Sequence, residues 1–317
     1  MLNRKLGPAC AIAACLAAAI ASASFEVEVN PGTAPVGRGL PLIINGRETN
    51  WDTVAVFVMP GETLALEVPP DEPGTGWIAH GGTLVESGPG RSEWIAPEAA
   101  GRYRLVAVCG ASVKELNAFV KVPRAQVRNG ELNGYRLGNY PKTNPFPGFV
   151  VPDGFIEVTP ELLDTPLSPR HTLGQFVPPE PSGWPKYIVL REDLILKLEL
   201  LTDLIVEKGH ACTRLEVMSG FRTPARQDAR GGGRNSAHIY GGAADVYIDE
   251  SGNGSLDDLN GDGKSDSQDA RLLASYVDEL EQRYPEFVGG VGWYRRTRAR
   301  TAFVHVDTRG ERMRWNQ

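Results

Sequence analysis

The stretch from Ser219 to Asp249 constrains the fold more than any other part of this 317-residue chain. It contains His238 and Asp245 in the pattern Ser-x-His-x-x-Gly-x-Ala-x-Asp, and a second histidine, His305, lies far along the chain in the apolar run Phe303–Asp307. Two imidazoles and one carboxylate are ligands that Zn²⁺ accepts while keeping a position open for water. An unpaired carboxylate among the apolar neighbours of Asp245 would be costly. We therefore expect a fold that joins these three side chains around a metal ion, or, as the spacing also allows, an Asp–His pair that holds two strands together.

Composition excludes some classes of function. Hydrophobic residues make up 41% of the chain and charged residues 23%, which is ordinary for a soluble globular protein. The length suits about two domains. A formal net charge of -6 gives no reason to expect binding to nucleic acid or to an anionic membrane surface.

Residues 1–23 have the features of a secretory signal peptide. Arg4 and Lys5 precede the small apolar residues 11–20, and Ala21-Ser-Ala23 is an A-x-A cleavage signal. The apolar run is too short for a transmembrane span. We expect an exported protein of the periplasm or cell envelope, with lipid anchoring at Cys15 as the alternative.

Two cysteines, Cys109 and Cys212, remain after such a cleavage. In an oxidising compartment an even pair can form a disulfide, which here would tie two predicted domains together. Two separately buried thiols are the alternative, and the sequence does not decide between them.

Residues 24–123 are expected to form an all-β sandwich. Short alternating runs separated by Pro-Gly punctuation are typical of that fold. The passage Trp94-Ile-Ala-Pro97, followed by Gly101-Arg-Tyr103, is similar to immunoglobulin-like domains of bacteria. The predicted strands are Phe25–Val29, Thr53–Val58, Thr63–Val68, Tyr103–Val108 and Asn117–Val122.

Residues 124–187 are rich in proline and carry many aromatic residues. A disordered linker would not hold so many aromatics, so we expect an ordered but irregular strap that connects the domains. His171 in this segment is expected to be a packing or surface residue rather than a site residue.

Residues 188–317 are expected to form an α+β domain with an antiparallel sheet. Leucines and isoleucine recur with helical spacing in Arg191–Gly209, and Ser267–Tyr284 shows a second apolar stripe. The predicted strands are Arg214–Met218, Ala243–Ile248 and Ala302–Asp307.

The polar residues and glycines of this domain resemble the M15 family of zinc D-Ala-D-Ala peptidases, which is related to hedgehog-type metallopeptidases. The resemblance rests on Ser219-Gly-Phe-Arg222, on Ser236 to Asp245, on Gly289 to Tyr294 and on Phe303 to Asp307. It implies that His238, Asp245 and His305 are the zinc ligands. It also implies that Arg222 lies near the substrate, as an oxyanion or carboxylate partner, and that Ser236 contacts the substrate.

One position departs from that family. Many members carry a catalytic carboxylate three residues before the last histidine, where this chain has Ala302. On a strand, residues two apart face the same side, so Asp307 points with His305. Asp307 is therefore expected either to act as the general base or to orient His305 from behind.

A second metal signal lies in the insertion 249–269, after the second predicted strand. The spacing of Asp258, Asn260, Asp262, Lys264 and Asp269, with Gly263 at the sixth position, matches a calcium loop of EF-hand type that runs into a helix. We expect a structural Ca²⁺ beside the zinc site, with an acidic turn as the alternative.

The sequence thus predicts an exported zinc peptidase that cuts peptidoglycan peptide bonds involving D-amino acids, as a carboxypeptidase or endopeptidase. Ala302 favours an alternative, a zinc-loaded but inactive homologue that binds cell-wall peptide. A third hypothesis is a structural envelope protein whose Asp–His cluster only packs.

Overall fold

The computed structural model describes residues 41–69, 74–143, 145–180, 182–231 and 235–317, and these residues all belong to one compact unit. The expected signal peptide, the lipid-anchoring alternative at Cys15 and the predicted strand Phe25–Val29 lie outside these residues. Helices and mainly antiparallel sheets are both present, as expected. No helix of the described part is long and apolar enough to cross a membrane.

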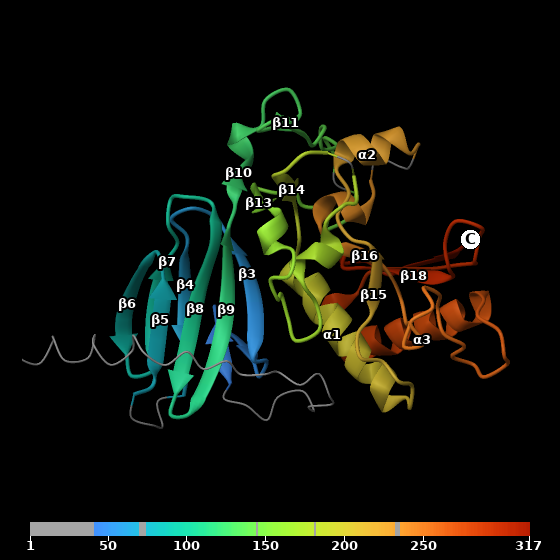
Figure 1. Ribbon diagram of the computed structural model, residues 1–317, viewed down its shortest axis with the longest axis horizontal. Coiled ribbons are helices and arrows are strands. Elements are labelled where there is room, and N and C mark those ends of the chain that lie inside the picture. Colours follow the sequence, from blue (N-terminus) through green and yellow to red (C-terminus); the bar gives the residue numbers. More distant parts are fainter. Residues whose placement is uncertain (1–40, 70–73, 144, 181, 232–234) are drawn as a thin grey trace, which may run out of the picture. The chain divides into compact units, whose positions relative to one another are not determined.

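The strands between residues 42 and 120 form two sheets that share a core (Figure 1). Leu64 and Leu66 are buried while their neighbours along the strand are exposed, and Trp94 is fully buried between the sheets. This alternation is what a sandwich of two half-buried sheets requires. One sheet has the order β2 (Arg47–Thr49), β1 (Leu42–Ile44), β4 (Thr63–Glu67), β7 (Arg91–Ile95), β6 (Thr83–Gly88), and the other β3 (Thr53–Val58), β9 (Ser112–Val120), β8 (Gly101–Cys109), β5 (Gly76–His80).

The edge strand β3 is covered by later parts of the chain. The outward N–H of Ala55 donates to the carbonyl of Leu167 at 2.9 Å, and the N–H of Phe57 donates to the Glu192 carboxylate at 3.0 Å. The Asn117 side chain, fully buried on the neighbouring strand, donates to the carbonyl of Pro166 at 3.1 Å. Buried backbone groups of the sheet edge are thus satisfied within the same chain.

The connecting segment is ordered and mostly irregular. His171 is buried, its Nδ1 lies 3.1 Å from the Gln175 side chain and its ring contacts Phe176, and it is not part of the group of His238, Asp245 and His305. The regular elements here are β10 (Val122–Pro123), β11 (Glu131–Leu132), β12 (Tyr135–Arg136), β13 (Gly154–Val158), β14 (Lys186–Ile188), η1 (Arg124–Gln126), η2 (Pro160–Leu162) and η3 (Leu173–Phe176).

The last part of the chain packs helices against one face of a five-stranded sheet (Figure 1). The sheet has the order β15 (Glu216–Ser219), β16 (Ala243–Tyr247), β18 (Phe303–Asp307), β17 (Gly290–Tyr294), β19 (Met313–Asn316). The helical elements are α1 (Glu192–Glu207), α2 (Pro224–Ala229), α3 (Ser267–Arg283), η4 (Ala237–Tyr240) and η5 (Pro285–Phe287). The apolar stripe predicted for α1 is buried in the core that this sheet shares with α3.

The sheet differs from the expected one at its edge, where β17 and β19 run parallel. The chain reverses after β17 and again after β18, so β19 has the direction of β17. Because β19 pairs with β17 instead of β18, the pair is parallel.

Cys109 and Cys212 are two separate buried thiols. Of the two alternatives that the sequence leaves open, the structure has the one without a disulfide. Burial raises the pKa of Cys212 to about 12, which keeps it protonated.

Candidate metal centre

Five residues in register form a row across the sheet, one from each strand. Ser219 pairs with Asp245, Asp245 with His305, His305 with Gly292, and Gly292 with Trp315. On β18, Val304 and Val306 belong to the core shared with the helices, so the alternation of the strand turns His305 to the other face. The candidate site therefore lies on the sheet face away from α1 and α3.

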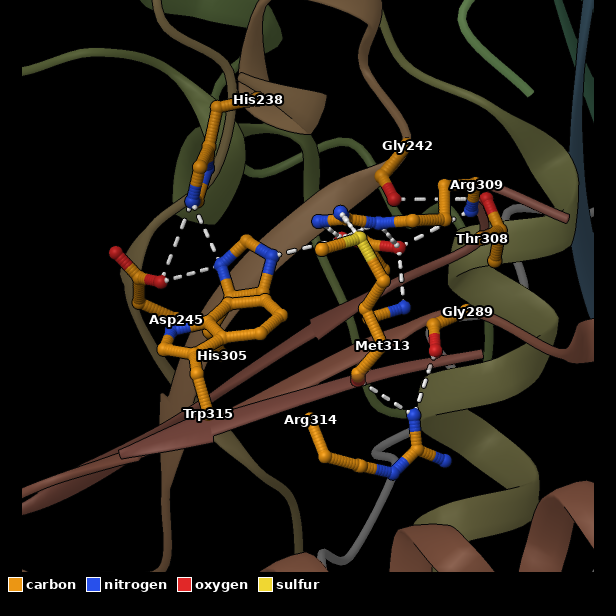
Figure 2. A network of polar contacts seen from close by, with 12 residues as sticks. His238, Gly242, Asp245, Gly289, His305, Thr308, Arg309, Met313, Arg314 and Trp315 are labelled. Carbon is orange, nitrogen blue, oxygen red and sulfur yellow. Dashed lines mark hydrogen bonds and ion pairs between the residues drawn. The ribbon is translucent and has the colours of Figure 1, made fainter. Parts of the chain in front are cut away.

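His238 reaches this row from η4, which precedes β16. Its Nε2 lies 3.2 Å from Asp245 Oδ1 and 3.1 Å from His305 Nδ1, and His305 Nδ1 lies 3.0 Å from the same Asp245 oxygen (Figure 2). All three side chains are buried. The structure thus joins the three residues that the sequence singled out, although they are up to 67 positions apart.

In each imidazole one nitrogen faces the other ligand atoms and the second, outer nitrogen faces away from them. The hydrogen bond of the outer nitrogen determines whether the inner one carries a hydrogen or a lone pair. His238 Nδ1 lies 2.7 Å from the carbonyl oxygen of Gly220, and His305 Nε2 lies 2.9 Å from Asp307 Oδ2. Both partners only accept hydrogen bonds, so the outer nitrogens carry the hydrogens. In neutral imidazoles the inner nitrogens are then bare, and two lone pairs and a carboxylate oxygen face one another.

A cation at the centre balances this arrangement. The three ligand atoms lie within 4.8 Å of one another. Burial lowers the pKa of His238, which keeps this imidazole neutral and able to bind a metal. Burial also acts to lower the pKa of His305, but hydrogen bonds with Asp245 and Asp307 raise it overall. The group of His238, Asp245 and His305 can therefore bind a metal ion.

Asp307 lies behind His305, on the side away from the other ligand atoms. Its Oδ1 accepts hydrogen bonds from the N–H of Gly290 at 2.7 Å and of Arg309 at 3.0 Å, and its Oδ2 is shared by His305 and the Arg309 guanidinium. Burial acts to raise the pKa of the Asp307 carboxyl, but His305 and Arg309 hold it well below its usual range. Of the two roles expected for Asp307, this geometry favours orientation of His305 over that of a general base.

Arg222 touches the other oxygen of the Asp245 carboxylate. Its Nη2 forms an ion pair with Asp245 Oδ2, and its Nε donates to the Ser219 hydroxyl at 3.0 Å. The side chain retains 17% of its exposure, so the guanidinium borders the metal-ligating group and is also reachable from solvent. Ser236 is half-buried at the N-terminus of η4, two residues before His238, and its side chain does not cap the helix.

We expect Arg222→Gln to weaken metal binding about 10–100-fold, because Arg222 holds the carboxylate that supplies the shared oxygen. The measurement is a zinc titration against a competing chelator. Arg214→Gln is the control, since Arg214 pairs with Glu216 at the exposed start of β15. Equal affinity of the Arg222 and Arg214 variants would contradict this role.

The predicted calcium loop has its carboxylates turned toward backbone N–H groups. Asp258 accepts from Gly261 at 2.8 Å and Gly263 at 2.7 Å, and Asp262 accepts from Lys264 at 3.0 Å. Asp269, fully buried, accepts from Leu259, Asn260 and Asp266 and forms a capping box at the start of α3. Among the described residues, the acidic side chains of this loop are not brought together as a group that could hold a metal ion, so Ca²⁺ binding by Asp258, Asn260, Asp262, Lys264 and Asp269 stays a prediction.

Four residues of the site's surroundings were not predicted. Arg309 forms an ion pair with Asp307. The centroid of the Trp315 ring lies 5.2 Å from that of the His305 ring (Figure 2). The Trp315 ring also covers Gly292, where any side chain would collide with it. Lys197 is fully buried and donates to the carbonyl of Asp307 and to Glu281. Arg309 could have been found from strand alternation, since it lies two positions after Asp307. The Lys197–Glu281 pair has no local signal, because 84 positions separate its members.

Searches against protein-family models, curated proteins and solved structures found no match for this chain.

Proposed function

We propose that this chain is a zinc metallopeptidase that hydrolyses peptide bonds involving D-amino acids in peptidoglycan, as a carboxypeptidase or an endopeptidase. The observation that carries the proposal is the buried group of two imidazoles and one carboxylate whose outer atoms are tied by Gly220, Asp307 and Arg222. The substrate class comes from the resemblance of the segments around this group to the M15 family. An exported protein of the periplasm or envelope would meet that substrate.

Each residue has a defined task in this proposal. His238 Nε2, Asp245 Oδ1 and His305 Nδ1 would hold Zn²⁺, which when bound supplies a Lewis acid and a water of lowered pKa. Asp307 keeps the Nε2–H tautomer of His305 and orients its ring. Arg222 and Ser236 would contact the substrate, with the Arg222 guanidinium beside the developing oxyanion or the terminal carboxylate.

A specific observation favours the alternative function, a zinc-loaded module that binds cell-wall peptide without cleaving it. Position 302, where the family carries its proton-accepting carboxylate, is a fully buried alanine. Both oxygens of Asp307 are engaged by Arg309, His305 and Gly290. Neither residue offers a free carboxylate to a metal-bound water.

Zinc analysis and digestion of purified sacculi separate these functions. We expect about one zinc per chain in the wild type and in the control His80→Ala, which changes an exposed histidine of the sandwich, and none in His238→Ala. Release of new peptide fragments by the wild type and not by His238→Ala would support the peptidase. Zinc with sacculus binding but without fragments would support the binding module. Absence of zinc from the folded wild type would contradict both and leave a packing cluster.

A further inference from the structure

A cavity of about 310 Å³ borders η4, the short helix that carries His238. Its walls come from residues 150–156 of the connecting segment and residues 188–191 before α1, with Lys121 and Tyr240 completing the lining. This volume is at the lower end of the roughly 300–1,000 Å³ usual for small-molecule sites. We call it the Tyr240 cavity.

Aliphatic side chains make up most of its wall. Ile156, Ile188 and Leu190 are buried in the wall, and Val150 is 65% exposed at its rim. An exposed valine beside a concave aliphatic surface is a suitable contact for an apolar group of a ligand.

Three polar groups of the lining have no partner within the described part of the protein, and a ligand could supply one to each. The Tyr240 hydroxyl is buried and has no hydrogen-bond partner among the described residues, a condition that costs free energy. Within the same residues, the half-buried Lys121 and the exposed Asp153 make no ion pair, although the charge of Lys121 acts through space on Glu192. The other cation of the lining, Arg191, is already paired with Asp193.

The cavity wall is joined to the metal-ligating loop. The N–H of Arg191 donates to the carbonyl of Gly241 at 3.1 Å. A side chain at Gly241 would meet the carbonyl carbon of Val189 at 2.6 Å, so the two segments are in direct backbone contact. Tyr240 itself lies two positions after His238 in η4. A ligand in the cavity would therefore touch the element that positions His238.

We propose that the Tyr240 cavity binds a small zwitterionic amino acid with an aliphatic side chain. Its carboxylate pairs with Lys121, its ammonium pairs with Asp153, and its side chain packs on the aliphatic wall. The Tyr240 hydroxyl supplies a further hydrogen bond. A ligand with one charge only would contact just one of Lys121 and Asp153, and a purely polar one would leave the aliphatic wall uncovered. This site does not depend on the proposed peptidase activity.

Isothermal titration with leucine tests the proposal. Leucine is expected to bind. Leucine amide and 4-methylpentanoate each lack one of its charges, and their affinity is expected to be lower by about tenfold or more. Leucyl-leucine in a separate titration shows whether a dipeptide is also accepted. Lys121→Met and Asp153→Asn should each weaken leucine binding about tenfold or more, whereas the control Lys142→Met, at an exposed position, leaves it unchanged.

Tyr240→Phe gives a readout that a merely structural role would not produce. It removes an unpartnered buried hydroxyl, so it should raise the Tm of the unliganded protein while weakening leucine binding several-fold. The proposal is overturned if leucine does not bind the folded wild type at concentrations on the order of 10 mM, whether or not leucyl-leucine binds. It is equally overturned if binding survives Lys121→Met and Asp153→Asn, or if a metal chelator abolishes it.

Discussion

Asp307→Asn is expected to destabilise the protein by about 3–5 kcal/mol, the usual result of removing one partner from a buried ion pair. Asp307 is fully buried, and Arg309 retains only 8% of its exposure, so the guanidinium would be left without a counter-charge. The asparagine amide would also place a donor among the N–H groups of Gly290 and Arg309. Urea denaturation at neutral pH measures the change.

The same replacement at Asp278 provides the control. Asp278 is paired with Arg312 and Arg314, but it is 34% exposed, and surface pairs of this kind contribute about 0–1 kcal/mol. Asp307→Asn should in addition weaken zinc binding about 10–100-fold, because His305 loses the group that fixes its tautomer. Unchanged stability and zinc affinity would show that the Asp307 carboxylate does not act through His305 and Arg309.

Acid should reduce the difference between wild type and Asp307→Asn. Burial alone would raise the pKa of Asp307, but its hydrogen bonds and charges hold it below the value of about 3.9 found in unfolded chains. The stability from this carboxylate is therefore fully present above that value and is lost as the pH falls through the lower folded pKa. The difference in unfolding free energy should be constant near neutral pH and should shrink below about pH 4.

Lys197→Met should cost a similar amount, about 3–5 kcal/mol. The Lys197 ammonium is fully buried and donates to Glu281 at 2.7 Å and to the carbonyls of Phe287 and Asp307, each at 2.8 Å. Methionine fills the volume but removes the donor shared by two carbonyls and the Glu281 carboxylate, which keeps only the Gly289 N–H and Arg314. Urea denaturation again gives the change in the free energy of unfolding.

Lys208→Met is the matched control, because Lys208 pairs with Glu279 at 2.6 Å but is 32% exposed. Its loss should cost about 1 kcal/mol or less. Since Lys197 holds the backbone of Asp307, its variant should also weaken zinc binding, which Lys208→Met should not do. An equal effect of the two lysine variants on stability would contradict the buried pair as a support of β18.

Local patterns predicted the two long helices and several strands well. The predicted helix Ser267–Tyr284 corresponds to α3 (Ser267–Arg283), and the run Thr53–Val58 is β3. Periodicity of apolar residues determines such elements, because one face must be buried. The short helix α2 was not predicted, although Thr223 caps it and Pro224 opens it, because six residues are too few to show a stripe.

The ligand group was predicted residue by residue, but its support was not. His238, Asp245 and His305 are recognisable because their residue types suit a metal. Lys197 and Glu281 support the site as a buried ion pair between two helices that are far apart in the sequence. Neither burial of a charge nor such a pairing produces a periodic pattern in the sequence. For Asp307, the sequence left two roles open, and the contacts with Arg309 and Gly290 favour orientation of His305.

The contacts along β3 have a consequence for how the chain can be divided. The N–H groups of Ala55 and Phe57 find their acceptors at Leu167 and Glu192, beyond the last strand of the sandwich. A fragment that stops after β9 would present these groups as an open sheet edge, a template on which strands of other molecules can add. The sandwich therefore relies on Leu167 and Glu192, later in the chain, to cover this edge, and it is not an independent module.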